Sequence, residues 1–372
     1  MRHLHSAEGV VRRAEPVGEG VWRLTVDVAG AERRALLYEQ FTPPAAPGDR
    51  VALNTTAVDM GLGTGGFDFV VHVIGKPRAP HAPSGHIMKL RYTPAQTPVL
   101  AVEEPSSPYH ETIKRQLDVA GMPVVVLALH SQLAPAAAAL RLALGRAAII
   151  VYVMTDGAAL PIAFSRTVQW LKQRAVVDKT VTVGHALGGD VEAVTLFSGL
   201  LAARWVLGAH VAVVGMGPGV AGTGTTFGTT AVEVGQHADA AAVLGGRVFA
   251  APRLSFADGR ARHFGVSHHT LTAFGRVAQR RCTLVLPRLS RRQRDVVMGQ
   301  LAAAGVPARH DVREHDGGRE ALDWLKEQGF VLRSMGRGPD AERALFMAAA
   351  AAGSVAAQEA NPLPTQIGRA HV

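Results

Sequence analysis

The chain has almost no cysteine. Its 372 residues include one, Cys282, which lies in the apolar run CTLVLP. A single cysteine cannot form a disulfide within the chain, so a disulfide-stapled fold is excluded. A zinc site built from several cysteines is excluded for the same reason. We therefore predict a buried structural thiol at Cys282 and a fold that depends on its apolar core.

Long apolar runs are also missing. No stretch of about 18 residues escapes interruption by Arg, His or Gly, and the N-terminal MRHLHSAEGVVRRAEP lacks the apolar centre of a signal peptide. Apolar residues still make up 48% of the sequence, enough to bury one or two sizeable cores. The composition therefore predicts a globular protein of the cytoplasm, with no membrane partner.

Lysine is scarce although the chain is basic. The formal net charge is +9, but only 6 of the 39 basic residues are lysine, a bias typical of GC-rich codon usage. The densest basic segment contains Arg276, Arg280, Arg281, Arg288, Arg291, Arg292 and Arg294. No aromatic residue is interleaved there to stack on bases, so nucleic acid is not expected as a partner.

Turn and strand signals divide the chain into parts. Residues 1–75 hold short alternating runs such as VWRLTVDV and FDFVVHVIG between Gly and Pro turns, which predict a β-barrel-like domain. Frequent prolines over residues 76–108 exclude a long helix and predict a linker or arm. An α/β domain is expected over 109–356 and a tail over 357–372.

The last six residues, 367–372, match a translated sequencing-library adapter, so we expect the natural chain to end near Thr365.

Apolar strands alternate with amphipathic helices in the α/β part. The strand-like runs are PVVVLALH (123–130), AAIIVYVMTDG (147–157), TVTVGH (180–185) and HVAVVG (210–215). Strands that are apolar throughout are buried on both faces, which is typical of a parallel sheet covered by helices. The predicted fold class is therefore α/β, with a mainly parallel sheet flanked by helices and preceded by the small barrel. Helices are also expected from residue 190 onward and over the alanine-rich 342–357.

Several pieces of this pattern resemble a known family. The pieces are TDGAALP, GHALGGDVEAV, GMGPGVAGTGTTFGTT and RSMGRG, together with NTTAVDMGLGTGG in the barrel-like part. They are similar to a family of uncharacterised bacterial proteins, domain of unknown function 3866. The resemblance extends over nearly the whole chain, up to about Gly353. It implies no activity, so function has to be inferred from the residues.

The segment 210–230, HVAVVGMGPGVAGTGTTFGTT, changes abruptly from an apolar strand to glycines and threonines. Glycine lets a ligand approach bare N–H groups and threonine adds hydroxyl donors, so the segment predicts a cradle for a phosphate or carboxylate. The candidate ligand-binding residues are Gly217, Gly219, Gly222, Thr223, Gly224, Thr225 and Thr226. A purely structural glycine loop is the alternative.

The same segment contains the GxGxxG pattern of dinucleotide-binding sites, starting at Gly217. Such a site also needs a helix that begins at the motif and an acidic residue at the tip of the next strand, about 20 residues on. Asp239 has this spacing but lies in a segment, 232–244, that is predicted to be helical. The Lys-Ser/Thr ending of a P-loop is missing as well.

Polar residues follow the other strand-like runs. His130, Asp156 and His185 stand at or just beyond strand ends, and Asp190 follows closely. The carboxyl ends of parallel strands meet at one edge, so we expect these residues to converge with the glycine segment. Asp156, His185 and Asp190 are candidates for catalysis or for binding a divalent metal, and His130 is a further catalytic candidate. Alternatively, Asp190 caps a helix with Glu192 in its first turn.

Two adjacent histidines occur in GVSHHT (265–270), with His263 just upstream. Adjacent side chains are expected to point in different directions, so at most one of the pair should enter a shared site. We take His268 as the catalytic candidate. Ser267 or Thr270 would then cap the helix that follows.

Together these features predict a hydrolase or transferase that acts on a small phosphorylated or nucleotide-like metabolite at the Gly/Thr-rich segment. The expected partner is a small anionic ligand. The cofactor stays open, with a divalent metal as the candidate, and the oligomeric state is open to a homo-oligomer. Two alternatives remain, a non-catalytic ligand-binding or assembly protein and a dinucleotide-dependent oxidoreductase.

Overall fold

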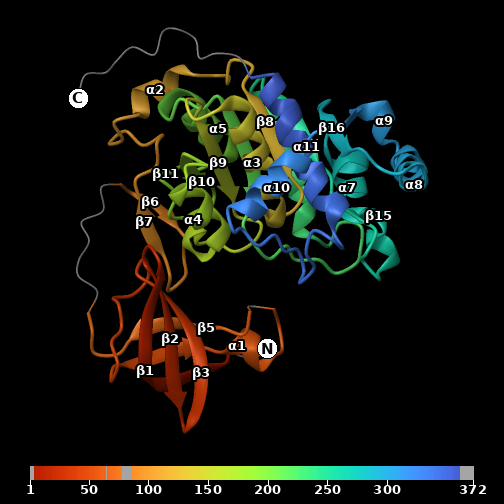
Figure 1. Cartoon of the computed structure of the whole chain (residues 1–372). Helices are drawn as coiled ribbons and strands as arrows, with labels where there is room; N and C mark the ends of the chain where they lie inside the picture. The colour runs from red at the N-terminus through yellow and green to blue at the C-terminus, as the bar shows by residue number, and fades with distance from the viewer. Residues whose placement is uncertain (1–3, 64, 78–84, 361–372) are drawn as a thin grey trace. The chain divides into compact units, whose positions relative to one another are not determined.

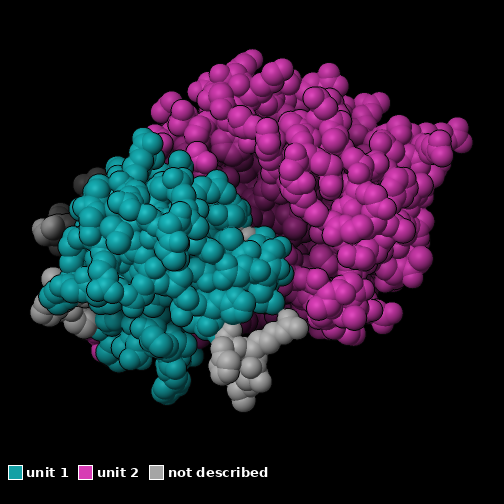
Figure 2. Space-filling view, turned by 90° about the horizontal axis from the view of Figure 1, so that it is seen from below, with its two compact units in different colours: residues 1–99 teal, residues 100–372 magenta. Residues whose placement is uncertain are grey.

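The chain divides into two units, residues 1–99 and 100–372 (Figure 2). The computed structural model describes residues 4–63, 65–77 and 85–360. Among these residues, no helix combines the length and the apolar character needed to span a bilayer. The adapter-like residues 367–372, and the predicted chain end near Thr365, lie outside the described residues.

The first unit contains a closed five-stranded barrel, which confirms the predicted barrel (Figure 1). Its strands are β1 (Ser6–Gly18), β2 (Val21–Val28), β3 (Ala31–Tyr38), β4 (Arg50–Asn54) and β5 (Asp68–Val73), and α1 (Thr56–Asp59) follows β4. The strand order is β1-β2-β3-β5-β4, and β4 pairs with β1 to close the barrel. Leu24, Leu37 and Leu53 fill the interior because alternate residues of each strand face inward.

The proline-rich segment 76–108 contains two short antiparallel strands, β6 (Ile87–Lys89) and β7 (Thr97–Val99). The boundary between the two units follows Val99 and therefore lies inside this segment. Helix α2 (His110–Arg115) is the first helix of the second unit.

The second unit is built on an eight-stranded sheet in which every pair is parallel, as the continuous apolar runs predict. Its order is β11-β10-β9-β12-β8-β13-β16-β17. The strands are β8 (Pro123–Leu127), β9 (Ile150–Thr155), β10 (Lys179–Thr182), β11 (Val191–Glu192), β12 (Val211–Met216), β13 (Arg247–Ala251), β16 (Thr283–Pro287) and β17 (Asp311–His315). A two-stranded antiparallel pair, β14 (Leu254–Ser255) and β15 (Gly265–Val266), lies between β13 and β16 in the chain.

Helices cover both faces of this sheet (Figure 1). One face packs against α3 (Leu133–Leu144), α4 (Arg166–Gln173), α10 (Arg319–Glu327) and α11 (Arg343–Gln358). The other packs against α5 (Leu196–Leu201), α6 (Glu233–Val243), α7 (His268–Thr272) with the π-helical turn that follows it, α8 (Arg291–Ala303) and α9 (Val306–Arg309). The predicted alanine-rich helix and the helical position of Asp239 are both confirmed.

The chain reverses its direction of winding between β8 and β12, which are neighbours in the sheet. From β8 the chain crosses through α3 on one face to β9, whereas from β12 it crosses through α6 on the other face to β13. The loops leaving the two strands diverge, so a crevice opens at their carboxyl ends, where open parallel sheets bind ligands. The segments after Leu127 and Met216 therefore border this crevice.

The helix expected from residue 190 onward starts later than predicted, because helical structure covers only Leu196–Leu201 and Ala202–Val206. Residues Val191–Glu192 form β11, which pairs with β10, and α5 begins only at Leu196, with Thr195 as its N-cap. Asp190 therefore caps no helix, and Glu192 lies in a strand. The local pattern DVEAV resembles a helix start, but pairing at the edge of the sheet satisfies the backbone of these residues instead.

Close packing of α11 on α3 depends on Gly353. A Cβ at this position would lie 2.4 Å from the carbonyl oxygen of Ala136 in α3. Gly353→Ala is therefore expected to destabilise the second unit by about 1–3 kcal/mol, because the two helices must separate. In the exposed middle of α8, where no atom lies within 4 Å of the position that a Cβ would take, Gly299→Ala is expected to stabilise by about 0.5–1 kcal/mol. Urea unfolding of both variants measures the change in the free energy of unfolding. A change of the same sign in both variants would contradict the close packing of α11 on α3.

Candidate functional site

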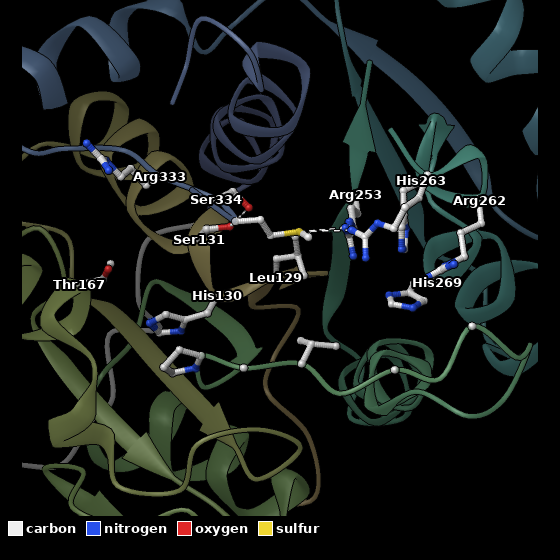
Figure 3. A pocket seen from close by; sticks show the side chains of 17 residues that line it. Leu129, His130, Ser131, Thr167, Arg253, Arg262, His263, His269, Arg333 and Ser334 are labelled. Carbon is white, nitrogen blue, oxygen red and sulfur yellow. Dashed lines mark hydrogen bonds between the residues drawn. The ribbon is translucent and has the colours of Figure 1, made fainter. Parts of the chain in front are cut away.

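A cavity of about 430 Å³ lies at the carboxyl edge of the sheet (Figure 3). Loops that follow three adjacent strands line it, together with α4 and the segment after α10. Leu129, His130 and Ser131 follow β8; Pro218, Gly219, Val220, Gly222 and Gly224 follow β12; Arg253, Arg260, Arg262, His263 and His269 follow β13; Thr167, Arg333, Ser334 and Met335 complete the lining. The cavity is thus located where the winding of the chain reverses.

The lining carries positive charge. It includes four arginines, and neither aspartate nor glutamate is among its residues. Figure 3 shows Arg253, Arg262, His263 and His269 gathered on one side, with His130 across from them. These arginines give that wall of the cavity a positive electrostatic potential.

The innermost of these arginines, Arg253, is buried and shares its counterion. Its guanidinium lies 3.4 Å from a carboxylate oxygen of Asp258, which also accepts hydrogen bonds from Arg260 and lies 3.4 Å from Arg337. The hydrogen bonds from Arg260 hold the pKa of Asp258 well below its usual range. Burial lowers the pKa of Arg253 to about 10, so the group stays protonated at neutral pH. One carboxylate thus faces three guanidinium groups.

Three histidines meet beside this wall. His263, His268 and His269 each present one ring nitrogen, and the three atoms lie within 4.8 Å of one another. Burial is the largest cause that lowers the pKa of His263 to about 4 and that of His269 to about 3, and it lowers the pKa of His268 too. The rings are therefore neutral at pH 7, the form in which imidazole donates a lone pair.

The expectation that adjacent histidines diverge was wrong. The ring centroids of His268 and His269 are 4.3 Å apart, and each ring is about 5 Å from that of His263. Successive residues of a helix are rotated by only about 100°, so two long side chains in the first turn of α7 can lean toward a third group. Ser267 caps this helix, as predicted, by accepting the amide of His269, and its oxygen lies 2.8 Å from Nδ1 of His263.

The glycine segment borders the cavity, but its threonines have another role. Gly219, Gly222 and Gly224 line the cavity, whereas the hydroxyls of Thr223 and Thr225 lie 3.0 Å apart and bond within the loop. The Thr223 hydroxyl donates to the carbonyl of Gly228, and that of Thr225 accepts the amide of the same residue. Thr226 is exposed and, like Gly217, is not among the lining residues. The hydroxyls close a loop that presents glycine backbone to the cavity.

No helix begins at the GxGxxG motif. The described chain continues as a loop until the 3-10 turn Thr230–Val232, which α6 follows. The backbone near Gly217 is instead crowded, since a Cβ there would lie 2.4 Å from the carbonyl oxygen of Ala159. The first glycine therefore serves the contact between two loops rather than a pyrophosphate.

The structure separates the three residues predicted as metal ligands. Asp156 accepts a hydrogen bond from the backbone amide of His185, so these two lie together at the carboxyl edge. Asp190 is held by Lys172 and by the amide and hydroxyl of Thr180, at the beginning of β10. Asp190 thus lies toward the opposite end of that strand and does not complete a site with the other two.

His130 lines the cavity, and both of its ring nitrogens have partners. Nε2 lies 2.6 Å from the hydroxyl of Ser165, which also caps α4 by accepting the amide of Val168, and Nδ1 lies 3.2 Å from the carbonyl oxygen of Met216. Burial lowers the pKa of His130 to about 4. These contacts join α4 to the end of β12, and a catalytic role for His130 stays a prediction.

Sequence reasoning missed the arginines. Arg253 stands two residues after β13, and the strand-tip rule applied to the other strands would have found it. It also missed Glu233 and His237 in α6, whose side chains lie 3.9 Å apart near Asp156. Burial raises the pKa of Glu233, and Asp156 adds to the shift.

A protein-family model described as "Protein of unknown function (DUF3866)" matches residues 34–353. The chain belongs to the DUF3866 family. The match confirms the resemblance noted in the sequence, and it extends from within β3 to within α11. All lining residues of the cavity in this DUF3866 protein therefore fall inside the matched region. Comparisons with curated proteins and with solved structures give no match.

Proposed function

We propose that this DUF3866 protein binds a small phosphorylated metabolite in the arginine-lined cavity and acts on it by hydrolysis or group transfer. The observation that carries the proposal is the composition of the lining, with four arginines and no carboxylate. Planar guanidinium groups match phosphate oxygens in pairs of parallel hydrogen bonds. A cavity of about 430 Å³ falls within the range of small-molecule sites.

The position of Arg253 supports a specific anion site over a diffuse basic surface. Its guanidinium is buried, and its ion-pair distance to Asp258 is 3.4 Å, longer than the 2.8 Å pair between Asp258 and Arg260. Asp258 is thus engaged mainly by Arg260. A phosphate oxygen would give the buried guanidinium of Arg253 a hydrogen-bond acceptor of its own, in place of the Asp258 carboxylate that it shares with Arg260.

The glycine segment supports the same assignment. Gly219 has φ +97° and Gly224 has φ +84°, a left-handed backbone that favours glycine. No side chain shields the backbone at these positions, so a ligand can approach it closely. Backbone N–H groups in such turns are common donors to phosphate.

Calorimetric titration tests the binding half of the proposal. Sugar phosphates and nucleoside monophosphates are each compared with the same compound lacking phosphate. Binding is expected only for phosphorylated members, with an affinity that falls as salt increases. Arg333→Gln, which removes an exposed arginine of the lining, should weaken that binding by several-fold. Equal binding of phosphorylated and unphosphorylated compounds would rule the proposal out.

A turnover assay tests the catalytic half. Each compound that binds is incubated with the protein, and release of inorganic phosphate or of a transferred group is followed. The assay is run with and without added divalent metal ions. Binding without turnover in every case would favour a non-catalytic ligand-binding protein, the alternative that the sequence raised.

A further inference from the structure

We propose that His263, His268 and His269 bind a divalent metal ion of the zinc class, with an open coordination position toward the arginine-lined cavity. The metal site itself rests on the three histidines alone. The second part of the inference, that an anion in the cavity contacts this metal, rests on the proposed function.

The geometry of the rings carries the metal site. Three ring nitrogens lie within 4.8 Å of one another. Zinc bound tetrahedrally at about 2.0–2.1 Å from each nitrogen places the nitrogens about 3.3 Å apart, so modest rotations of the side chains close the site. Within the described part of the chain, Nε2 of His268 and Nδ1 of His269 are buried without a hydrogen-bond partner. Buried polar atoms of this kind require a partner, and a metal ion supplies one.

Neighbouring groups orient the rings. Nδ1 of His263 lies 2.8 Å from the hydroxyl of Ser267, which leaves Nε2 of that ring available. Such a contact fixes the ring of a metal ligand and sets its tautomer. On the other side, Nε2 of His269 lies 3.3 Å from the position that a Cβ of residue 222 would take, so the glycine there keeps the ring accessible from the loop.

The ligand set leaves a coordination position open. Three histidines without a fourth protein ligand are the arrangement of catalytic zinc sites, in which water or substrate takes the remaining position. His263 and His269 both line the cavity, so that position faces the space assigned to the anion. A metal there supplies a Lewis acid that polarises a phosphoryl oxygen, which suits hydrolysis or transfer at phosphorus.

The nearby arginines predict coupling between metal and anion. Arg253, Arg260 and Arg262 line the same cavity as His263 and His269. Their positive charges repel a bound cation, and an anion placed between the metal and the guanidinium groups offsets that repulsion. Each ligand should therefore raise the affinity for the other by the same factor.

Metal titration of the full chain after chelator treatment tests the site. We expect one zinc ion per chain and, with cobalt as the probe, the intense visible absorption of tetrahedral cobalt. His269→Gln and His268→Gln should each weaken zinc binding by at least tenfold. The matched control is His210→Gln, just before β12 at the opposite edge of the sheet, and it should retain full affinity. Circular dichroism checks that each variant is folded.

Inorganic phosphate separates the two parts of the inference. We expect phosphate to tighten zinc binding, and zinc to tighten phosphate binding by the same factor. Absence of zinc binding, or zinc binding that persists in both His268→Gln and His269→Gln, would overturn the metal site. Phosphate binding to the metal-free protein would still support the proposed function in that case. Zinc that binds at the triad without changing phosphate affinity would overturn the coupling. Zinc binding at the triad in a protein that binds no phosphate would overturn the proposed function and leave the metal site.

Discussion

Replacing Arg253 by methionine is expected to weaken binding of a phosphorylated ligand by on the order of 100-fold, since truncating a buried charged partner costs about 2–5 kcal/mol. Arg253 is the buried member of the lining arginines, so its charge is screened least by water. Methionine keeps an unbranched apolar stem while removing the guanidinium. Isothermal titration with the best phosphorylated binder measures the loss.

The fold should survive this substitution, because Asp258 keeps its hydrogen bonds from Arg260 and its contact with Arg337. The matched control is Arg292→Met, which removes the same charge from an exposed position on α8. It should leave affinity within about twofold, since exposed charges at a distance are screened by salt. Equal affinity of wild type and Arg253→Met would exclude the buried guanidinium from the binding site.

The fold could be predicted because its signals are local and repeated. The strands of the sheet are apolar over their whole length, as in AAIIVYVMTDG, and each predicts a strand buried on both faces. Alternation in VWRLTVDV predicts the one-sided burial of a barrel strand in the same way. Parallel topology then predicts that the ends of β8 and the glycine segment border one crevice, where the cavity lies.

The site could be predicted only in part because its contacts are long-range. Asp190 bonds with Thr180 through the pairing of β10 with β11, which no local pattern encodes. From the sequence, the threonines that follow Gly222 are expected to donate hydrogen bonds to a ligand. In the structure, the hydroxyls of Thr223 and Thr225 bond within their own loop instead. The convergence of His263 with His269 depends on the chain returning through β15 before α7 begins. Sequence spacing alone does not specify such a return.

Lowering the pH from 7 to about 4 is expected to destabilise the second unit steeply. His130 and His237 are buried, and burial lowers the pKa of each from 6.5 to about 4. The unfolded chain takes up these protons near pH 6.5, whereas the folded chain resists them until about pH 4. Stability is therefore fully present above pH 6.5 and falls as the pH drops through this window. At about 1.4 kcal/mol per pKa unit, each histidine contributes about 3 kcal/mol.

The histidines beside the cavity add to the effect within this window, because the pKa values of His263, His268 and His269 are lowered as well. The acidic groups act outside the window or oppose the effect weakly. The pKa of Asp258 is held below its usual range, so its contribution is lost only at lower pH, once an unfolded aspartate begins to protonate. Glu233 works in the opposite direction, because its pKa is raised by burial and by Asp156, and it lies 3.9 Å from His237. Its protonation in the folded state offsets part of the loss on the acidic side of the window.

Urea unfolding at several pH values between 7 and 4.5 measures the effect. Trp170, Trp205 and Trp324 report on the second unit, and Trp22→Phe removes the barrel's contribution to fluorescence. In that background His237→Leu should flatten the pH dependence by the share of one buried histidine. An unchanged slope in His237→Leu would mean that this ring already takes up its proton in the folded protein. That result would contradict the apolar environment of the ring, in which Val234 and Ala238 of the same helix belong to the buried core.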